Sequence, residues 1–146
     1  MINNALSHWH NIAIVIAQTK YLEANVVLPS RFPLKETMDR LVITLQEQEM
    51  IIYARINRQV ESKWYGLVTR PLEFVIFDDP RLSGPLVERD PIAAICFPAR
   101  IIAWEDSKGN CLVAFRDLPA IIKKWGWKEA ISWPNLAPVI ARALSE

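Results

Sequence analysis

The chain has 146 residues, of which 51% are hydrophobic and 23% are charged, and its 17 basic and 16 acidic residues leave a formal net charge of +1. This length suits one globular domain, and the composition is that of a folded rather than a disordered chain. The near-neutral charge without a basic stripe argues against nucleic-acid binding. The longest apolar run, Ile12 to Ala17, is far shorter than the roughly 20 residues of a membrane-spanning helix.

The N-terminal residues predict an amphipathic helix over 2–17, because seven apolar side chains share one face at 100° per residue. A strand through 12–17 is the alternative. We expect residues 1–22 to form a helical extension and residues 23–146 to form the domain. The N-terminus has no basic region and no cleavage site, which predicts a cytoplasmic rather than a secreted protein. Since the helix has no basic face, we expect it to dock on its own domain or on a dimer partner rather than on a membrane.

The first half of the domain predicts one helix among several strands. The helix is the clearest element, since Leu34, Met38, Leu41, Val42 and Leu45 form one apolar stripe. Residues 50–57 alternate, which predicts a half-buried strand with Arg55 and Asn57 on the outer face. Other strands are predicted over residues 24–28, 63–69 and 72–77.

The most polar stretch of the second half is 77–91, which holds the carboxylates of Asp78, Asp79, Glu88 and Asp90. Adjacent acids point to opposite sides of an extended chain, and the prolines and glycine between 80 and 85 favour turns. We interpret the stretch as a corner that ends in a short helix over 92–95, capped by Asp90. A hydrolase or isomerase site built from these four acids is the alternative.

The C-terminal half predicts a hairpin followed by two helices. The strands of the hairpin cover 100–106 and 110–116 around a turn at Gly109. One helix over 118–125 ends at Gly126, and Asn135 caps the last helix. Consecutive strands with short links predict an α+β fold, with a mostly antiparallel sheet and helices packed on one face.

The order of these segments resembles that of a known family. The segments "LKETMDRLVITLQEQEMIIYARIN", "GLVTRPLEFVIF", "SGPL", "RDP" and "FPARIIAWED" resemble the DUF302 family, small bacterial and archaeal proteins of unknown function. The resemblance runs from about Ala24 to Leu144. It implies a curved sheet similar to the TATA-binding-protein-like (TBP-like) class and a homodimer, and it implies no activity. The chain departs from the family pattern at Asp78 and Asp79, and again at residues 115–119.

Few residues are suited to metal binding or nucleophilic catalysis. His8 and His10 are the only histidines; they lie on opposite sides of a helix, or on one side of a strand without other ligands nearby, so we expect no metal. Cys96 and Cys111 have neither redox nor zinc spacing, and we expect buried free thiols rather than a disulfide. The glycines are too widely spaced to cradle a phosphate, so no cofactor is expected.

Six tryptophans are many for this length. They can pack the core and a dimer interface, or they can line an apolar pocket between the sheet and the helices. We therefore predict a non-catalytic homodimeric domain that binds an apolar small molecule or a protein partner. We expect neither nucleic acid nor membrane as a partner, and nucleic-acid binding is kept only as a remote alternative. The residues predicted to bind a ligand are Trp64, Phe77, Asp78, Asp79, Trp104 and Phe115.

Overall fold

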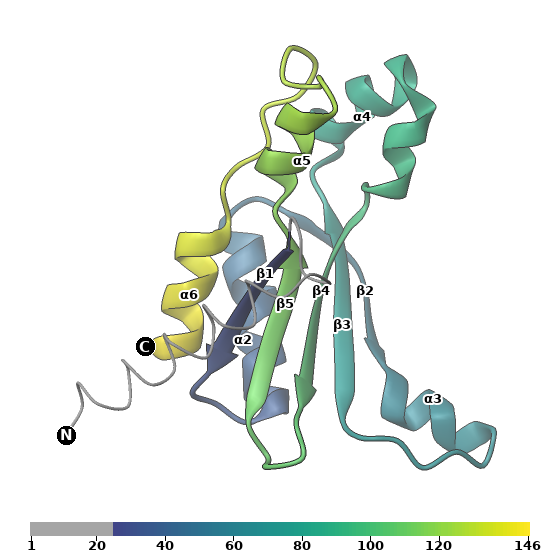
Figure 1. The fold of residues 1–146 in the computed structure, drawn as a ribbon, viewed down its shortest axis with the longest axis vertical. Helices are drawn as coiled ribbons and strands as arrows, with labels where there is room; N and C mark the ends of the chain where they lie inside the picture. The colour runs from purple at the N-terminus through teal and green to yellow at the C-terminus, as the bar shows by residue number, and fades with distance from the viewer. Residues whose placement is uncertain (1–24) are drawn as a thin grey trace.

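An antiparallel sheet organises the chain, as the computed structural model of residues 25–146 shows (Figure 1). In the described residues the sheet has five strands in the order β1-β5-β4-β3-β2, so β2 to β5 follow one another and β1 pairs with β5. The predicted α+β fold is confirmed, whereas the predicted helix within 1–22 lies outside the described residues. The strands are β1 (Asn25–Ser30), β2 (Ile51–Asn57), β3 (Leu72–Asp78), β4 (Ala99–Glu105) and β5 (Cys111–Arg116).

The helices lie on one face of the sheet and at its two ends (Figure 1). Helices α2 and α6 pack against each other and against the sheet. In Figure 1, α4 and α5 lie at the upper end of the strands and α3 at the lower end. The bounds are α2 (Leu34–Glu47), α3 (Arg58–Trp64), α4 (Pro80–Arg89), the 3₁₀-helix η2 (Pro91–Ile95), α5 (Leu118–Lys124) and α6 (Ala137–Ser145).

The hydrophobic core forms between α2, α6 and the covered face of the sheet. Met38, Leu41 and Leu45, from the predicted stripe of α2, are fully buried. They belong to one cluster with sheet residues such as Val75 and Ile101. Burial of each such side chain stabilises the fold by roughly 1.5–3 kcal/mol, and the stripe predicted from the sequence is confirmed.

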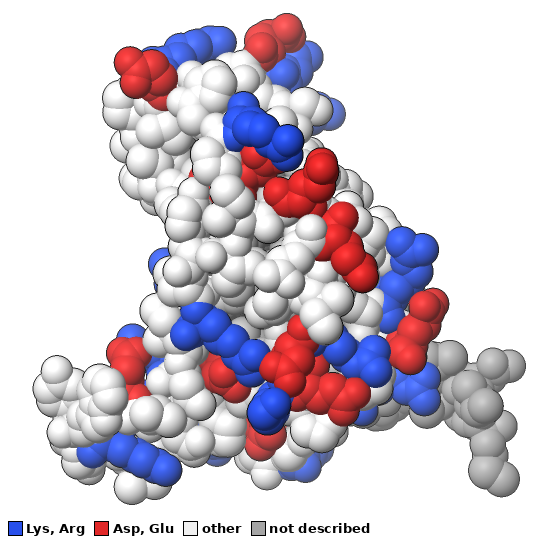
Figure 2. Space-filling model, turned by 180° about the vertical axis from the view of Figure 1, so that it is seen from behind, with Lys and Arg blue, Asp and Glu red and all other residues white. Residues whose placement is uncertain are grey.

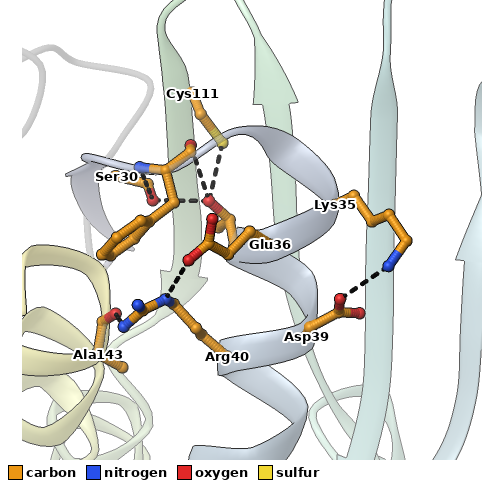
Figure 3. A network of polar contacts seen from close by, with 9 residues as sticks. Ser30, Lys35, Glu36, Asp39, Arg40, Cys111 and Ala143 are labelled. Carbon is orange, nitrogen blue, oxygen red and sulfur yellow. Dashed lines mark hydrogen bonds and ion pairs between the residues drawn. The ribbon is translucent and has the colours of Figure 1, made fainter.

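A small buried polar cluster joins β1, α2 and β5 (Figure 3). The hydroxyls of Ser30 and Thr37 form a hydrogen bond of 2.6 Å, and Thr37 also donates to the carbonyl of Phe32 at 3.1 Å. The thiol of Cys111 donates to the Thr37 hydroxyl at 3.5 Å. Since buried polar groups are costly without partners, these bonds fix the entry of α2 relative to both strands. Cys96 and Cys111 are both free thiols; Cys111 is buried as predicted, whereas Cys96 is only partly buried.

Two arginines hold the C-terminal end of α6. Arg31 donates to the carbonyl of Ser145 at 2.8 Å, and Arg40 donates to the carbonyl of Ala143 at 3.4 Å. Arg40 is oriented by Glu36 one turn earlier, at 3.1 Å (Figure 3). The last carbonyls of a helix lack partners within the helix and carry partial negative charge. Arg31 therefore attaches the end of α6 to the segment that joins β1 and α2, and Arg40 attaches it to α2 itself.

A bulge in β2 changes which side chains face the helices. Ile52 pairs with Phe77, but Ala54 pairs with Ile76, so one extra residue enters β2 between them. Beyond the bulge, Ala54 turns to the open face and Arg55 turns to the face that α2 covers. The predicted alternation of burial along β2 is confirmed, but the prediction that Arg55 faces outwards is wrong, because Arg55 pairs with Val75 of the helix-covered face.

The bulge lets Arg55 join an ion-pair network under α2. Its guanidinium contacts Glu73 of β3 at 3.1 Å and Asp39 of α2 at 2.6 Å. Glu73 is buried, and a buried carboxylate needs such a partner. Asp39 is shared with Lys35, 3.0 Å away. Arg55 thus ties β2, β3 and α2 together.

The predicted strand over 63–69 is wrong, because this region is α3 followed by a loop. The side chain of Asn57 accepts a hydrogen bond from the backbone of Val60 at 3.0 Å, which begins the helix. Gly66, with φ of 71°, follows its end. Trp64 and Val68 are 78% and 100% exposed. The β-prone residues have no neighbouring strand to pair with, since β2 pairs directly with β3.

The predicted corner at 77–91 is in large part a helix, α4. Asp79 accepts a hydrogen bond from the backbone of Arg81 at 3.1 Å and caps the helix. Pro80 stands in the first turn, where proline is tolerated, and Pro85 lies inside the helix. The prediction of turns was wrong because the prolines of this stretch are accommodated in a helix. The short helix predicted after Asp90 is confirmed as η2, but the predicted cap is wrong, because the Asp90 side chain makes no capping hydrogen bond.

We predict that Arg55→Ala lowers the free energy of unfolding by about 1–3 kcal/mol, because it leaves the buried Glu73 carboxylate without its partner. The measurement is urea denaturation at neutral pH. Arg58→Ala is the matched control, since Arg58 is exposed on α3 and surface substitutions usually cost under about 0.5 kcal/mol. Equal losses for the two variants would contradict the assigned network.

Candidate functional site

The face of the sheet turned away from α2 and α6 is apolar. Strand register aligns Phe74, Ile102 and Ala114 in one row across β3, β4 and β5. The next row contains Leu72 and Trp104. These side chains are partly exposed rather than buried. Exposed apolar patches of this kind mark binding sites or interfaces more often than scattered apolar residues do.

A cavity of about 880 Å³ lies at the end of the sheet where β4 begins and β5 ends. Its walls come from both faces of these strands, since pairing between them stops at Ile101 and Phe115. On the helix side the lining includes Phe77, Ile101, Phe115 and Trp133. On the open face it includes Arg100, Ile102, Trp104 and Ala114.

Trp133 forms a wall of the cavity from the segment between α5 and α6. Its ring lies 5.0 Å from that of Phe97 and 6.4 Å from that of Phe77, centroid to centroid. Nearby, the indole N–H of Trp127 donates to Asp90 at 2.9 Å. The aromatic contacts and this hydrogen bond attach the segment to the core, so the wall is fixed rather than a loose loop.

The structure brings together some of the predicted ligand-binding residues. Phe77, Trp104 and Phe115 all line the cavity. Trp64 does not line it and lies on the exposed arm formed by α3. Asp78 ends β3 and Asp79 caps α4, and neither of them lines the cavity.

Sequence reasoning missed two arginines and a tryptophan of this site. Arg100 and Arg116 line the cavity, and they stand at the ends of the hairpin that was predicted around Gly109. Counting outwards from that turn would have placed both arginines at the same end of the sheet. Trp133 also lines the cavity, but it belongs to neither helix nor strand, and no periodic pattern pointed to it.

Asp78 and Asp79 have opposite electrostatic environments. Asp78 is only 5% exposed; one carboxylate oxygen accepts from Ser83 at 2.6 Å, and the other is buried without a partner in the described residues. Burial raises the pKa of Asp78, outweighing the Ser83 bond. Hydrogen bonds from Arg81 lower the pKa of Asp79.

Opposite pKa shifts in two neighbouring acids are typical of acid–base pairs in enzymes. Here, however, the Asp79 carboxylate is already engaged by the helix cap and by the ion pair with Arg81, at 2.8 Å. Of the other two acids, Glu88 is exposed and Asp90 accepts from Trp127. The stretch thus serves to begin helix α4, with Asp79 as the cap of the helix and as the ion-pair partner of Arg81.

In residues 25–146, no three His, Cys, Asp or Glu side chains lie close enough together to hold a metal ion. His8 and His10 lie outside this part of the chain. None of the helices described is long and apolar enough to cross a membrane. From the side opposite to that of Figure 1, basic and acidic residues are interspersed over the surface rather than gathered by sign (Figure 2).

The architecture defines the class of protein: an α+β domain with an antiparallel sheet, one helix-covered face and an apolar cavity at the sheet end. The model for the family "Domain of unknown function DUF302" matches residues 26–143. The chain belongs to the DUF302 family, as the resemblance predicted.

The fold is shared with a solved structure of an uncharacterised DUF302 protein from Bacillus stearothermophilus. The TM-score is 0.67 at 12% sequence identity, and the match covers 83% of this chain and 95% of that one. At this identity the match shows the fold alone.

Curated relatives occur in Brucella. Proteins named "Fluoride-specific ion channel FluC 1" from Brucella suis and "FluC 2" from Brucella melitensis are each 27% identical over 92 residues, or 63% of this chain. The matched segment is 36% and 34% of those proteins. This chain therefore matches about a third of the length of these relatives.

We predict that Asp78→Asn becomes increasingly stable relative to wild type as pH rises above about 4. The pKa of Asp78 is raised from 3.8 in the folded state, so its contribution is full below that value and is lost as pH rises through the folded pKa. Asparagine does not titrate. The measurement is urea denaturation of both proteins between pH 3 and pH 7.

Asp79→Asn is the control with the opposite sign. The pKa of Asp79 is lowered from 3.8, so wild type keeps its Asp79 stabilisation above that value and loses it as pH falls through the folded pKa. The advantage of wild type over this variant should shrink in acid. A constant difference between Asp78→Asn and wild type over the whole range would contradict the burial of Asp78.

Proposed function

We propose that this domain binds an apolar small molecule in the cavity at the end of the sheet. The observation that supports the proposal is the cavity itself, with about 880 Å³ of space lined by aromatic and aliphatic side chains. Ligand sites commonly have volumes of roughly 300–1,000 Å³ and a mostly apolar lining with a few polar groups. Phe77, Trp104 and Phe115 supply the aromatic contacts.

The lining favours binding over catalysis. Its one carboxylate among the described residues, Asp117, accepts a hydrogen bond from the backbone of Ala120 at 3.1 Å and caps α5. Cys96 lines the cavity, but residues 25–146 contain no histidine to activate a thiol. Binding without chemistry, in the cytoplasm, is the function proposed here.

A homodimer joined through the open sheet face is the second proposal. The face is apolar over β2, β3 and β4, and a second copy would remove it from water. The partial match to proteins named as fluoride-specific ion channels supports the broader idea that this domain works beside another protein. A TBP-like curvature of the sheet, implied by the family resemblance, also stays a prediction.

We expect the neutral fluorescent probe N-phenyl-1-naphthylamine to bind saturably to the full chain, and Ala114→Phe to abolish that binding. The new ring would occupy the cavity from the middle of β5. Ala54→Phe is the matched control, because Ala54 lies on the same sheet face but does not line the cavity. A saturable signal that survives Ala114→Phe, or no saturable signal with wild type, would overturn the proposed binding site.

We expect the full chain to have twice its 16.8 kDa mass in size-exclusion chromatography with light scattering. Ile56→Glu should give the mass of one chain, because it introduces a charge into the open face. Ile43→Glu is the matched control, since Ile43 is 55% exposed on α2. Circular dichroism checks the fold of each variant. A monomeric wild type, or a dimer unaffected by Ile56→Glu, would refute this interface.

A further inference from the structure

Two arginines line the cavity, Arg100 from β4 and Arg116 from β5. Pairing between these two strands stops one residue before them, and Arg100 and Arg116 pair instead with Ile76 of β3 and Asn25 of β1. Successive side chains alternate, so both arginines lie on the open face. Two cations that line one cavity favour an anion in it.

The described residues supply no such anion. Lys123 of α5 also lines the cavity, and neither this lysine nor the two arginines has a carboxylate within ion-pair distance in residues 25–146. The Arg100 guanidinium lies over the ring of Phe74, 5.4 Å from its centroid. Asp117 is the one acid of the described lining, and its carboxylate caps α5. The described lining thus contains three cations and one carboxylate, and that carboxylate already accepts a hydrogen bond within α5.

An apolar track leads away from the arginines along β4 and β5. Ile102 and Ala114 form the next pair on the open face, and Trp104 follows. All three line the same cavity as Arg100 and Arg116. At 3.3–3.4 Å per residue, the distance along β4 from Arg100 to Trp104 is about 13 Å. The site therefore has a cationic end and an elongated apolar part.

We propose that the cavity binds a soluble amphiphile with one anionic head group and an apolar tail. The head group, a carboxylate or a phosphate monoester, binds to the cationic lining formed by Arg100 and Arg116, whose planar guanidinium groups suit either anion. The tail lies along Ile102 and Ala114 towards Trp104. This inference rests on the proposed function and specifies its ligand class.

The test is isothermal titration of the full chain with decanoate, decyl phosphate and decanol below their aggregation limits. The anionic compounds should bind at least about tenfold more tightly than decanol, because charge-assisted hydrogen bonds add to the apolar contacts. In the double variant Arg100→Gln and Arg116→Gln, the anions should lose that advantage while decanol binding stays unchanged. Arg89→Gln, an exposed arginine outside the cavity, should change neither.

The outcomes separate this inference from the proposed function. One outcome is that decanol and the neutral probe bind while the anions show no preference or the double glutamine variant shows no effect. That result overturns the anionic head group and leaves the proposed apolar site intact. No binding of any compound overturns both. A further arm uses phosphatidylglycerol vesicles: arginine-dependent co-sedimentation without decanoate binding would assign the arginines to a lipid surface and overturn the soluble amphiphile.

Discussion

The central strands of this domain are apolar on both faces, but α2 and α6 cover only one of them. In β4, Ile101 and Ala103 are buried under the helices, while Ile102 and Trp104 face the other way. Apolar surface removed from water contributes about 25 cal/mol per Å². The second face therefore gains free energy from whatever covers it, and the proposed ligand and the proposed dimer both follow from this constraint.

The polar contacts at the C-terminal end of α6 help to position the cavity wall, because they hold the helix that follows this wall in the chain. Arg31 and Arg40 bind the last carbonyls of α6, and α6 packs on α2. The segment just before α6 contributes Trp133 to the cavity wall. Hydrogen bonds at the C-terminal end of α6 thus help to fix Trp133, which precedes the N-terminal end of the same helix. Contacts far from a site can in this way support its geometry.

Charge in this domain is used in two different ways. Arg55 reaches the helix-covered face only because of the β2 bulge, and there Glu73 and Asp39 neutralise it. Arg100 and Arg116 line the cavity without ion pairs among the described residues. Arg55, held by two carboxylates, serves stability. Two arginines that line a cavity with apolar walls, and that form no ion pair within residues 25–146, are suited to recognising an anion.

The sequence by itself determined what depends on neighbours a few residues apart: the stripe of α2, the hairpin around Gly109, the end of α5 at Gly126 and the α+β class. It also supplied the family and three of the cavity residues, Phe77, Trp104 and Phe115. Only the tertiary structure decided the bulge after Ile52, the helical state of α3 and α4, the pairing of β1 with β5 and the place of Trp133. Periodicity and turn chemistry are local, whereas strand register, burial and a shared cavity depend on segments far apart in the chain meeting in space.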